Sequence, residues 1–323
     1  MFEIVFLGTS ASAPSIHRGL SAQVVIVKNR RFLIDCGEGT QRQLLKSGIG
    51  FKRLNRVLIT HGHLDHILGL GGLMSTFMRW ESIDELEIWG GRWALDRVQD
   101  LLYGVVLRGA QPPMPLHLID VRPGVLMEEA DFLVSAFPVN HRGRDCFGYV
   151  FQEKARRPFL VERAEALGVP AGPERARLVR GETITLGDGR VVRPDDVLGK
   201  DTPGARLVVT GDAASLDGLE SVAAGAHALV TEATYLDEDA EMAASFGHLT
   251  AGQAARFARE VGVQTLLLTH ISRRYRERDV IQEAQQYFAN SYVVRDFDRF
   301  SVAKGRPVHK VLPGEEPDEP EQA

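Results

Sequence analysis

The alternation of apolar and polar positions predicts short strands and helices mixed throughout the chain. In the first half we expect strands at Glu3–Leu7, Ala22–Val27, Arg31–Asp35 and Arg56–Ile59. A further strand is expected at Phe132–Val139. In the second half we expect strands at Arg206–Thr210, Ala228–Thr231 and Thr265–Thr269, and helices near Ala251–Val261 and Val280–Phe288. Strands and helices mixed in this way predict an α/β sandwich in which helices cover two sheets.

A segment of different character lies between the two halves, from about residue 151 to residue 204. Pro and Gly interrupt it too often for a core element. A long insertion of this kind is either an ordered functional arm or a linker. Residues 152–181 contain seven basic and four acidic side chains, a net charge of +3. Charge alone fits equally a solvated excursion and a phosphate-binding arm, for which Arg156, Arg157 and Arg163 are the candidate contacts.

Composition excludes several classes of protein. The 323 residues are 44% hydrophobic and 25% charged, as is ordinary for a globular protein. No apolar run reaches membrane-spanning length, and Met1–Leu7 lacks the features of a signal peptide. The two cysteines, Cys36 and Cys146, form no disulfide framework. We therefore expect a cytoplasmic protein that does not contact a membrane.

The net charge of −5 at first argues against a nucleic-acid partner. The acidic excess, however, lies in residues 311–323, which hold five acidic side chains and no basic one. Residues 1–310 are thus formally neutral and can carry a local basic patch. The acidic tail is also rich in proline, and we expect it to be disordered.

The run His61-Gly62-His63-Leu64-Asp65-His66, directly after a predicted strand, carries the strongest chemical signal. A single histidine after a strand is usually structural, but three histidines and an aspartate within six residues are hard to explain as coincidence. Zinc binds neutral imidazole nitrogens and carboxylate oxygens. Ligands at the end of a strand sit on a rigid base where a substrate can reach them. The run therefore predicts metal-assisted hydrolysis.

Three further candidate ligands, His141, Asp212 and His270, each follow a predicted strand. Each alone is more often a non-ligand, but the shared position after a strand makes a converging site credible. One metal would take His61, His63 and His141, the other would take Asp65, His66 and His270, and Asp212 would bridge them. Two metals lower the pKa of bound water to about 7 and clamp a phosphoryl group during in-line displacement.

His248 is the next candidate for chemistry. Thr250 and Gln253 fit a capping box for the following helix, so His248 is expected on a loop. It is either a surface histidine or a group that protonates a leaving oxygen. Glu232 follows a strand and is a hypothetical orienting carboxylate for His248. Arg273, in a basic cluster after His270, either contacts the phosphates of a substrate or lies in a solvated turn.

These motifs resemble known ones. His61–His66 resembles the signature of the metallo-β-lactamase superfamily, which includes lactamases, thioesterases, sulfatases and nucleases. More specific stretches are similar to the tRNase Z family, from residue 1 to about residue 305. Outside the insertion, these stretches are Phe6–Ser10, Asp35–Gln41, Gly247–Thr250 and Thr269–Tyr275. Inside the insertion, Leu167–Pro170 and Gly172-Pro173 resemble that family's flexible arm.

The resemblance implies a four-layer αβ/βα metallo-β-lactamase domain over residues 1–310, with a protruding arm inserted at about 151–204. It implies two zinc ions per subunit, held by the seven candidate ligands, with Asp65 also acting as general base and His248 assisting the leaving group. It implies an endoribonuclease that removes the 3′ trailer from precursor tRNA and leaves a 3′ hydroxyl on the tRNA. The arm would hold the tRNA, typically across a homodimer.

The chain departs from the family in one loop, and other activities fit its scaffold. Many members carry Pro-x-Lys-x-Arg-Asn, linked to sensing the CCA end, where this chain has Ile16 for Lys and Gly19 for Asn. The resemblance therefore does not carry CCA discrimination to this chain. One alternative is a hydrolase of small esters, such as a phosphodiesterase, arylsulfatase or thioesterase. Another is a redox di-iron protein, although those usually place Glu where His63 stands.

Overall fold

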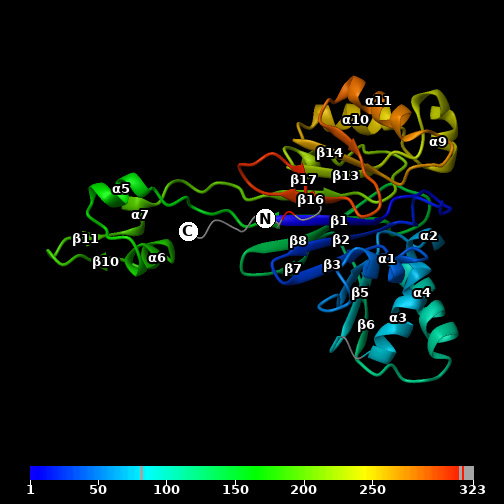
Figure 1. The fold of residues 1–323 in the computed structure, drawn as a ribbon, viewed down its shortest axis with the longest axis horizontal. Coiled ribbons are helices and arrows are strands. Elements are labelled where there is room, and N and C mark those ends of the chain that lie inside the picture. Colours follow the sequence, from blue (N-terminus) through cyan, green and yellow to red (C-terminus); the bar gives the residue numbers. More distant parts are fainter. Residues whose placement is uncertain (81–82, 313–314, 316–323) are drawn as a thin grey trace. The chain divides into compact units, whose positions relative to one another are not determined.

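The computed structural model describes residues 1–80, 83–312 and 315 (Figure 1). The chain folds into two compact units. Among the described residues, the first comprises Met1–Gln152 and the chain from Ala205 to Leu312, and the second comprises Glu153–Gly204. Most of the tail that we expect to be disordered, residues 311–323, lies outside the described residues. None of the described helices combines the length and apolar composition that a bilayer-spanning segment requires.

The first unit contains two mixed sheets. The eight-stranded sheet has the order β17-β16-β1-β2-β3-β4-β5-β6. Its strands are β1 (Phe2–Gly8), β2 (Ala22–Val27), β3 (Arg30–Ile34), β4 (Arg56–Leu58), β5 (Leu86–Gly90), β6 (Leu116–Asp120), β16 (Arg299–Val302) and β17 (His309–Lys310). The strands from β3 to β6 pair in parallel, whereas β1, β2, β16 and β17 pair antiparallel.

The second sheet has seven strands in the order β15-β14-β13-β12-β9-β8-β7. They are β7 (Gly124–Glu128), β8 (Phe132–Pro138), β9 (Phe147–Glu153), β12 (Arg206–Val209), β13 (Ala228–Glu232), β14 (Thr265–Thr269) and β15 (Ser291–Val293). The strands from β12 to β15 run parallel to one another, and β9 pairs antiparallel with β12.

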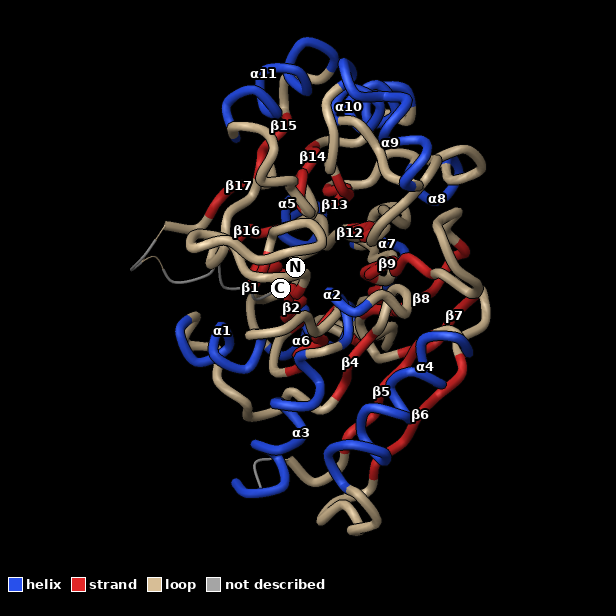
Figure 2. The backbone as a smooth tube through the Cα atoms, turned by 90° about the vertical axis from the view of Figure 1, so that its right-hand side faces the viewer, coloured by secondary structure: helices blue, strands red, loops and turns tan. Residues whose placement is uncertain are grey.

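Helices cover the outer faces of the two sheets (Figures 1 and 2). On the side of the first sheet lie α1 (Thr40–Lys46), α2 (Leu64–Ile67), α3 (Gly69–Trp80), α4 (Arg92–Gln99) and the π-helix η1 (Asp100–Leu107). On the side of the second lie α8 (Glu220–Ala223), the 3-10 turn η2 (Asp237–Asp239), α9 (Ala240–Phe246), α10 (Ala251–Glu260) and α11 (Glu277–Tyr287).

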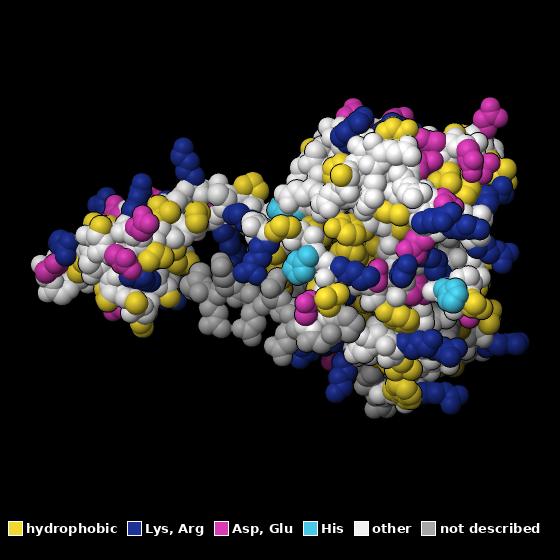
Figure 3. Space-filling model, turned by 45° about the horizontal axis from the view of Figure 1, so that its top comes forward, with side chains coloured by type: hydrophobic (Ala, Val, Ile, Leu, Met, Phe, Trp, Pro, Cys, Tyr) yellow, Lys and Arg dark blue, Asp and Glu magenta, His cyan; other side chains and the backbone are white. Residues whose placement is uncertain are grey.

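The second unit, which we call the arm, has a small core of its own. Its elements are α5 (Val161–Ala166), α6 (Pro173–Val179), β10 (Ile184–Thr185), β11 (Val191–Val192) and α7 (Pro194–Val197). They enclose a cluster of buried apolar side chains, Ala164, Val169, Leu178, Ile184, Val192, Val197 and Leu198. On the face of the arm drawn in Figure 3, basic and acidic side chains are intermingled. The frequent Gly and Pro residues had indicated that this segment contains no core element, yet its short helices pack around a small apolar core.

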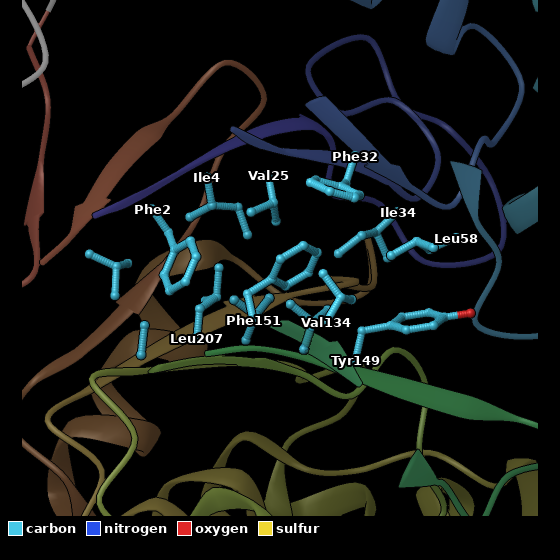
Figure 4. Close-up of a cluster of buried hydrophobic side chains, with 14 of the residues drawn as sticks. Phe2, Ile4, Val25, Phe32, Ile34, Leu58, Val134, Tyr149, Phe151 and Leu207 are labelled. Atoms are coloured by element: carbon cyan, nitrogen blue, oxygen red, sulfur yellow. The ribbon is translucent and has the colours of Figure 1, made fainter. Parts of the chain in front are cut away.

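The main core lies between the two sheets (Figure 4). Phe32 of the first sheet meets Phe151 of the second edge to face, with ring centroids 5.3 Å apart. Alternate residues of the same strands, such as Val5 and Val150, point outward and pack against the helices. Because both faces of the central strands are buried, strands such as β1, β12, β13 and β14 are mostly apolar. The predicted four-layer αβ/βα sandwich is confirmed.

Candidate metal centre

The ends of four strands deliver the predicted ligands to one place. The chain leaves β4 and turns through His61 and His63 into α2, whose first turn carries Asp65 and His66. The loops after β8, β12 and β14 carry the other three, His141, Asp212 and His270. Because these strands belong to both sheets, the centre lies where the carboxyl ends of strands from the two sheets meet.

The first group of donor atoms consists of three imidazoles. Nδ1 of His63 lies 2.9 Å from Nε2 of His61 and 3.3 Å from Nε2 of His141. Burial, together with the neighbouring histidines, lowers the pKa of His61 well below its usual value and that of His63 to about 4. These rings are therefore neutral near pH 7, which is the form that binds a metal ion.

The second group joins a carboxylate to two imidazoles. Asp65 Oδ2 lies 3.4 Å from His270 Nε2 and 3.8 Å from His66 Nε2. Asp212 Oδ2 lies 3.4 Å from His66 Nε2, 3.3 Å from His270 Nε2 and 3.8 Å from His61 Nε2. One oxygen of Asp212 is thus within reach of both groups, as a bridging ligand requires.

The outward nitrogens of four of these imidazoles are hydrogen-bonded, which fixes the nitrogen that faces inward. Each Nδ1 donates to an oxygen at 2.7–3.0 Å: His61 to Thr60 Oγ1, His66 to Asp35 Oδ2, His141 to the Gly247 carbonyl and His270 to Thr234 Oγ1. The two threonine hydroxyls donate in turn to buried carboxylates, those of Asp35 and Glu232. The inward Nε2 atoms are left as ligand atoms.

The donor set fits metal ions. Nε2 of His66 is buried and has no hydrogen-bond partner among the described residues, although buried polar atoms normally have one. Nitrogen and carboxylate oxygen donors suit zinc. The ligand atoms of each group of three lie within 4.8 Å of one another. Burial lowers the pKa of His66, but Asp212 and Asp35 outweigh it and raise that pKa, so a metal bound there would displace a proton.

His248 lies beside this cluster and is held by a buried carboxylate. Its Nδ1 donates to Glu232 at 2.9 Å and lies 3.9 Å from Asp212 Oδ2. Glu232 is fully buried and also accepts from the backbone N–H of Ala213 and Leu249. Burial lowers the pKa of His248, but the hydrogen bond and charge of Glu232 outweigh it and raise the pKa to about 9. The ring is therefore protonated at neutral pH and can donate a proton.

A cavity of about 640 Å³ opens onto Asp65, Asp212 and His248. We call it the catalytic cavity. Its rim carries three arginines from different segments, Arg97, Arg142 and the predicted phosphate contact Arg273. The other predicted contacts, Arg156, Arg157 and Arg163, lie in the arm.

Comparisons with known proteins identify the family. The family model of the anti-Pycsar protein Apyc1 matches residues 2–113, about a third of the chain. A ribonuclease Z of Bradyrhizobium diazoefficiens is 47% identical over 302 residues, which cover 94% of this chain and 100% of that protein. The chain belongs to the ribonuclease Z family. The predicted resemblance to tRNase Z is thereby confirmed.

Two solved structures share the fold of this chain. The short form of human tRNase Z is 25% identical and superimposes with a TM-score of 0.66, covering 93% of this chain and 99% of that one. The metallo-β-lactamase fold protein YhfI of Bacillus subtilis is 17% identical, with a TM-score of 0.64 and coverage of 92% and 98%. The predicted metallo-β-lactamase fold is confirmed.

Sequence reasoning brought together all seven candidate ligands and His248 but missed the groups that orient them. Asp35, Thr60 and Thr234 hold three of the ligand imidazoles. Asp35 lies in Asp35–Gln41, a stretch that resembles the tRNase Z family, and Thr234 lies two residues after Glu232. Neither position reveals its partner, because each hydrogen bond joins segments 31 or 36 residues apart.

Proposed function

We propose that this chain is an endoribonuclease of tRNA, which binds two zinc ions and removes the 3′ trailer of precursor tRNA. The observation that carries the proposal is the pair of donor groups joined by Asp212, beside a protonated His248. The near full-length similarity to proteins named ribonuclease Z and to human tRNase Z supports the substrate. The cut would leave a 3′ hydroxyl on the tRNA.

The metal ions would be held by His61, His63 and His141 on one side and by Asp65, His66 and His270 on the other, with Asp212 shared. Bound zinc polarises a phosphoryl oxygen and makes coordinated water acidic. Most of the donor side chains are buried, which strengthens the charge interactions among them.

Asp65 is suited to accept a proton. Burial raises its pKa, but the neighbouring His270 and His66 outweigh this and hold the pKa below its usual value. The group is therefore an ionised carboxylate at neutral pH. The backbone N–H of Ser12 donates to its Oδ2 at 3.0 Å and fixes its orientation. We assign Asp65 the role of general base in addition to that of ligand.

His248 supplies a proton at the opposite end of the reaction. In a cut that leaves a 3′ hydroxyl, the bond from phosphorus to O3′ breaks and O3′ gains a proton. His248, held protonated by Glu232 and lining the cavity, is the group that donates it. Without this proton, an unstable alkoxide would have to leave.

We also propose that the arm contacts the tRNA away from the cut. Arg163 is exposed on α5, and none of the described acidic groups pairs with it. Arg157 is engaged within the arm, with Asp195 at 2.6 Å and the carbonyls of Leu198 and Gly199. Arg157 thus has fewer free donors for RNA than Arg163. Action as a homodimer in the cytoplasm remains part of this proposal.

The test is cleavage of a precursor tRNA labelled at its 5′ end, followed by mapping of the product end. We expect one cut near the discriminator nucleotide and roughly 10²–10⁴-fold slower cleavage after His248→Ala, as is typical for loss of a general acid. Asp65→Ala should be at least as damaging. His117→Ala, which removes an exposed histidine on β6, is the matched control.

Elemental analysis of the purified protein completes the test. We expect two zinc ions per chain, whereas stoichiometric iron would favour the redox alternative. Cleavage that survives alanine at Asp65 or His248 would overturn the assigned mechanism. Loss of cleavage in His117→Ala would show that the assay reports folding instead.

A further inference from the structure

An exposed aromatic side chain stands in the catalytic cavity without a role in the chemistry. Phe246 is the last residue of α9 and lines the cavity together with His248 and Tyr235. It is 47% exposed, although phenylalanine is among the residues most often buried. This half-exposed ring, in a cavity lined by charged and polar groups, offers a flat apolar surface that a ligand can cover.

The backbone after Phe246 holds this ring next to an arginine. Gly247 caps α9 in the left-handed region, with φ of 69°. A Cβ at this position would lie 2.6 Å from Cγ of Arg142, so only glycine lets the Arg142 stem pass. The guanidinium carbon of Arg142 then lies 5.8 Å from the centroid of the Phe246 ring. Ring and guanidinium form one amphipathic surface.

Arg142 is available to an anion. It is exposed in the loop after β8, and no carboxylate among the described residues pairs with it. Arg97, by contrast, donates to the carbonyl of Gly62 at 2.7 Å and lies over the Trp93 ring. Of these two rim arginines, Arg142 is therefore the one whose guanidinium donates to none of the described groups and lies beside an open aromatic ring.

An aromatic ring with a neighbouring guanidinium is how proteins commonly hold an unpaired nucleotide. The base stacks on the ring, and the cation contacts the backbone phosphate. Tyr235 adds a second ring in the same cavity, 6.2 Å from the His248 ring. The chemistry of this surface suits a single-stranded nucleotide at the mouth of the metal centre.

The position of His248 decides which nucleotide this is. His248 is assigned the proton that goes to O3′ of the last tRNA nucleotide, so that nucleotide lies on the His248 side of the scissile phosphate. Phe246 is two residues from His248 and lines the same cavity. Resting on the proposed function, we propose that the base of the last tRNA nucleotide stacks on Phe246, and that Arg142 contacts the phosphate 5′ to that nucleotide.

The experiment is a double-mutant cycle in which one change is made in the enzyme and the other in the RNA substrate. Single-turnover kcat/KM is measured on a precursor tRNA and on the same RNA with an abasic last tRNA nucleotide. Removing the base should slow the unaltered enzyme roughly tenfold, as loss of one stacked base typically does. Phe246→Ala should slow cleavage of the intact RNA by about the same factor and be nearly insensitive to base removal. Phe246→Tyr should restore the sensitivity.

Tyr103→Ala is the matched control, because Tyr103 is 41% exposed on η1 and does not line the catalytic cavity. It should leave the rates and the sensitivity to base removal unchanged. Arg142→Ala should reduce the slope of log affinity against log salt by roughly 0.7, the value for one phosphate contact on a single strand. Arg144→Ala, an exposed neighbour outside the cavity, should leave that slope unchanged.

Independent effects of the Phe246 substitution and of base removal on the cleavage rate would overturn the inference. If Phe246→Ala and the abasic RNA slow the reaction by factors that multiply, the base does not stack on Phe246, and the proposed function is untouched. An unaltered salt slope in Arg142→Ala would overturn the phosphate contact. An unaltered enzyme that fails to cut precursor tRNA would overturn the proposed function and this inference together. Equal metal content in all variants shows that the centre is intact.

Discussion

Asp212 is the residue on which both donor groups depend. Its side chain is almost fully buried, and Oδ2 lies within 4.0 Å of an imidazole nitrogen of His61, His66, His141, His248 and His270. Burial raises its pKa, but the surrounding histidines outweigh burial and hold the pKa well below its usual value. A buried carboxylate that stays ionised needs positive charge close by, and metal ions held by the two donor groups would supply it.

Glu232 sets the protonation of His248, which leads to a prediction about pH. Glu232→Gln removes the charge that holds the His248 pKa at about 9, so that pKa should fall. Because a general acid must be protonated, activity is lost as pH rises through its pKa. The alkaline limb of the single-turnover rate should therefore move to lower pH in Glu232→Gln.

The control for this shift is the melting temperature of the metal-loaded protein, since Glu232 also accepts two backbone N–H bonds. The amide oxygen of the glutamine in Glu232→Gln can still accept one of these two backbone hydrogen bonds. An alkaline limb that stays in place, in a variant that folds and binds metal normally, would rule out His248 as the acid that Glu232 tunes.

The convergence of the candidate ligands could be predicted from sequence because the segments that carry them follow strands, and strand ends converge. The backbone at His270 could not. Its φ of 55° lies in the left-handed region, which a residue with a side chain adopts only when its surroundings compensate. Thr234 does this by contacting both Nδ1 and the carbonyl of His270. No local pattern in the sequence reveals such a contact.

Among the elements, strands with clean apolar patterns were predicted well. The strands at Ala22–Val27 and Thr265–Thr269 have the predicted bounds. Helix α3 was not predicted, because it begins at Gly69 and contains Gly71 and Gly72, and glycine disfavours helices. The structure explains Gly69: a Cβ there would lie 2.0 Å from a carbonyl oxygen, that of Gly37. Close packing of the helix start overrides the propensity.

The start of α10 offers a prediction at this scale. The capping box predicted from Thr250 and Gln253 is confirmed, with Thr250 Oγ1 accepting from the Gln253 N–H at 3.0 Å. Thr250 also donates to Asp237. Thr250→Ala should lower the free energy of unfolding by about 1–2 kcal/mol, as loss of an N-cap does. Urea unfolding of the metal-loaded protein measures this.

Thr250→Ser is the control, because it keeps the hydroxyl that caps the helix, and it should lose only a small part of the stability. If serine and alanine destabilise equally, the methyl group and not the cap is what matters at this position. The cap also has a functional consequence, since the helix begins three residues after His248 and fixes where its loop ends.

For the molecule as a whole, the boundaries of the arm could be predicted but its interior could not. An interruption from about 151 to 204 was visible because Pro, Gly and Arg replace the apolar alternation. The core of the arm was not visible, because helices of six and seven residues are too short to display a helical period. Its apolar residues are also scattered among charged ones, so no stretch of the arm looks buried on its own.

The arm provides the sharpest test of how the whole molecule selects its substrate. Gln152 of β9 pairs with Arg206 of β12 in antiparallel register, so the arm leaves and rejoins the first unit at adjacent positions. Replacing residues 154–203 with a short Gly-rich turn should therefore leave the two-sheet unit folded. Because a second, remote contact raises affinity by about 10²-fold or more, processing of precursor tRNA should fall by that order.

Hydrolysis of bis-p-nitrophenyl phosphate separates the arm from the metal centre. This small diester reaches the catalytic cavity without needing the arm, so its rate should be unchanged in the shortened protein. Asp65→Ala in the full chain should abolish both activities, because it damages the centre that both reactions use. Unchanged tRNA processing by the shortened protein would show that the arm contributes nothing to binding. Loss of both activities, with zinc still bound, would show instead that the arm supports the centre itself.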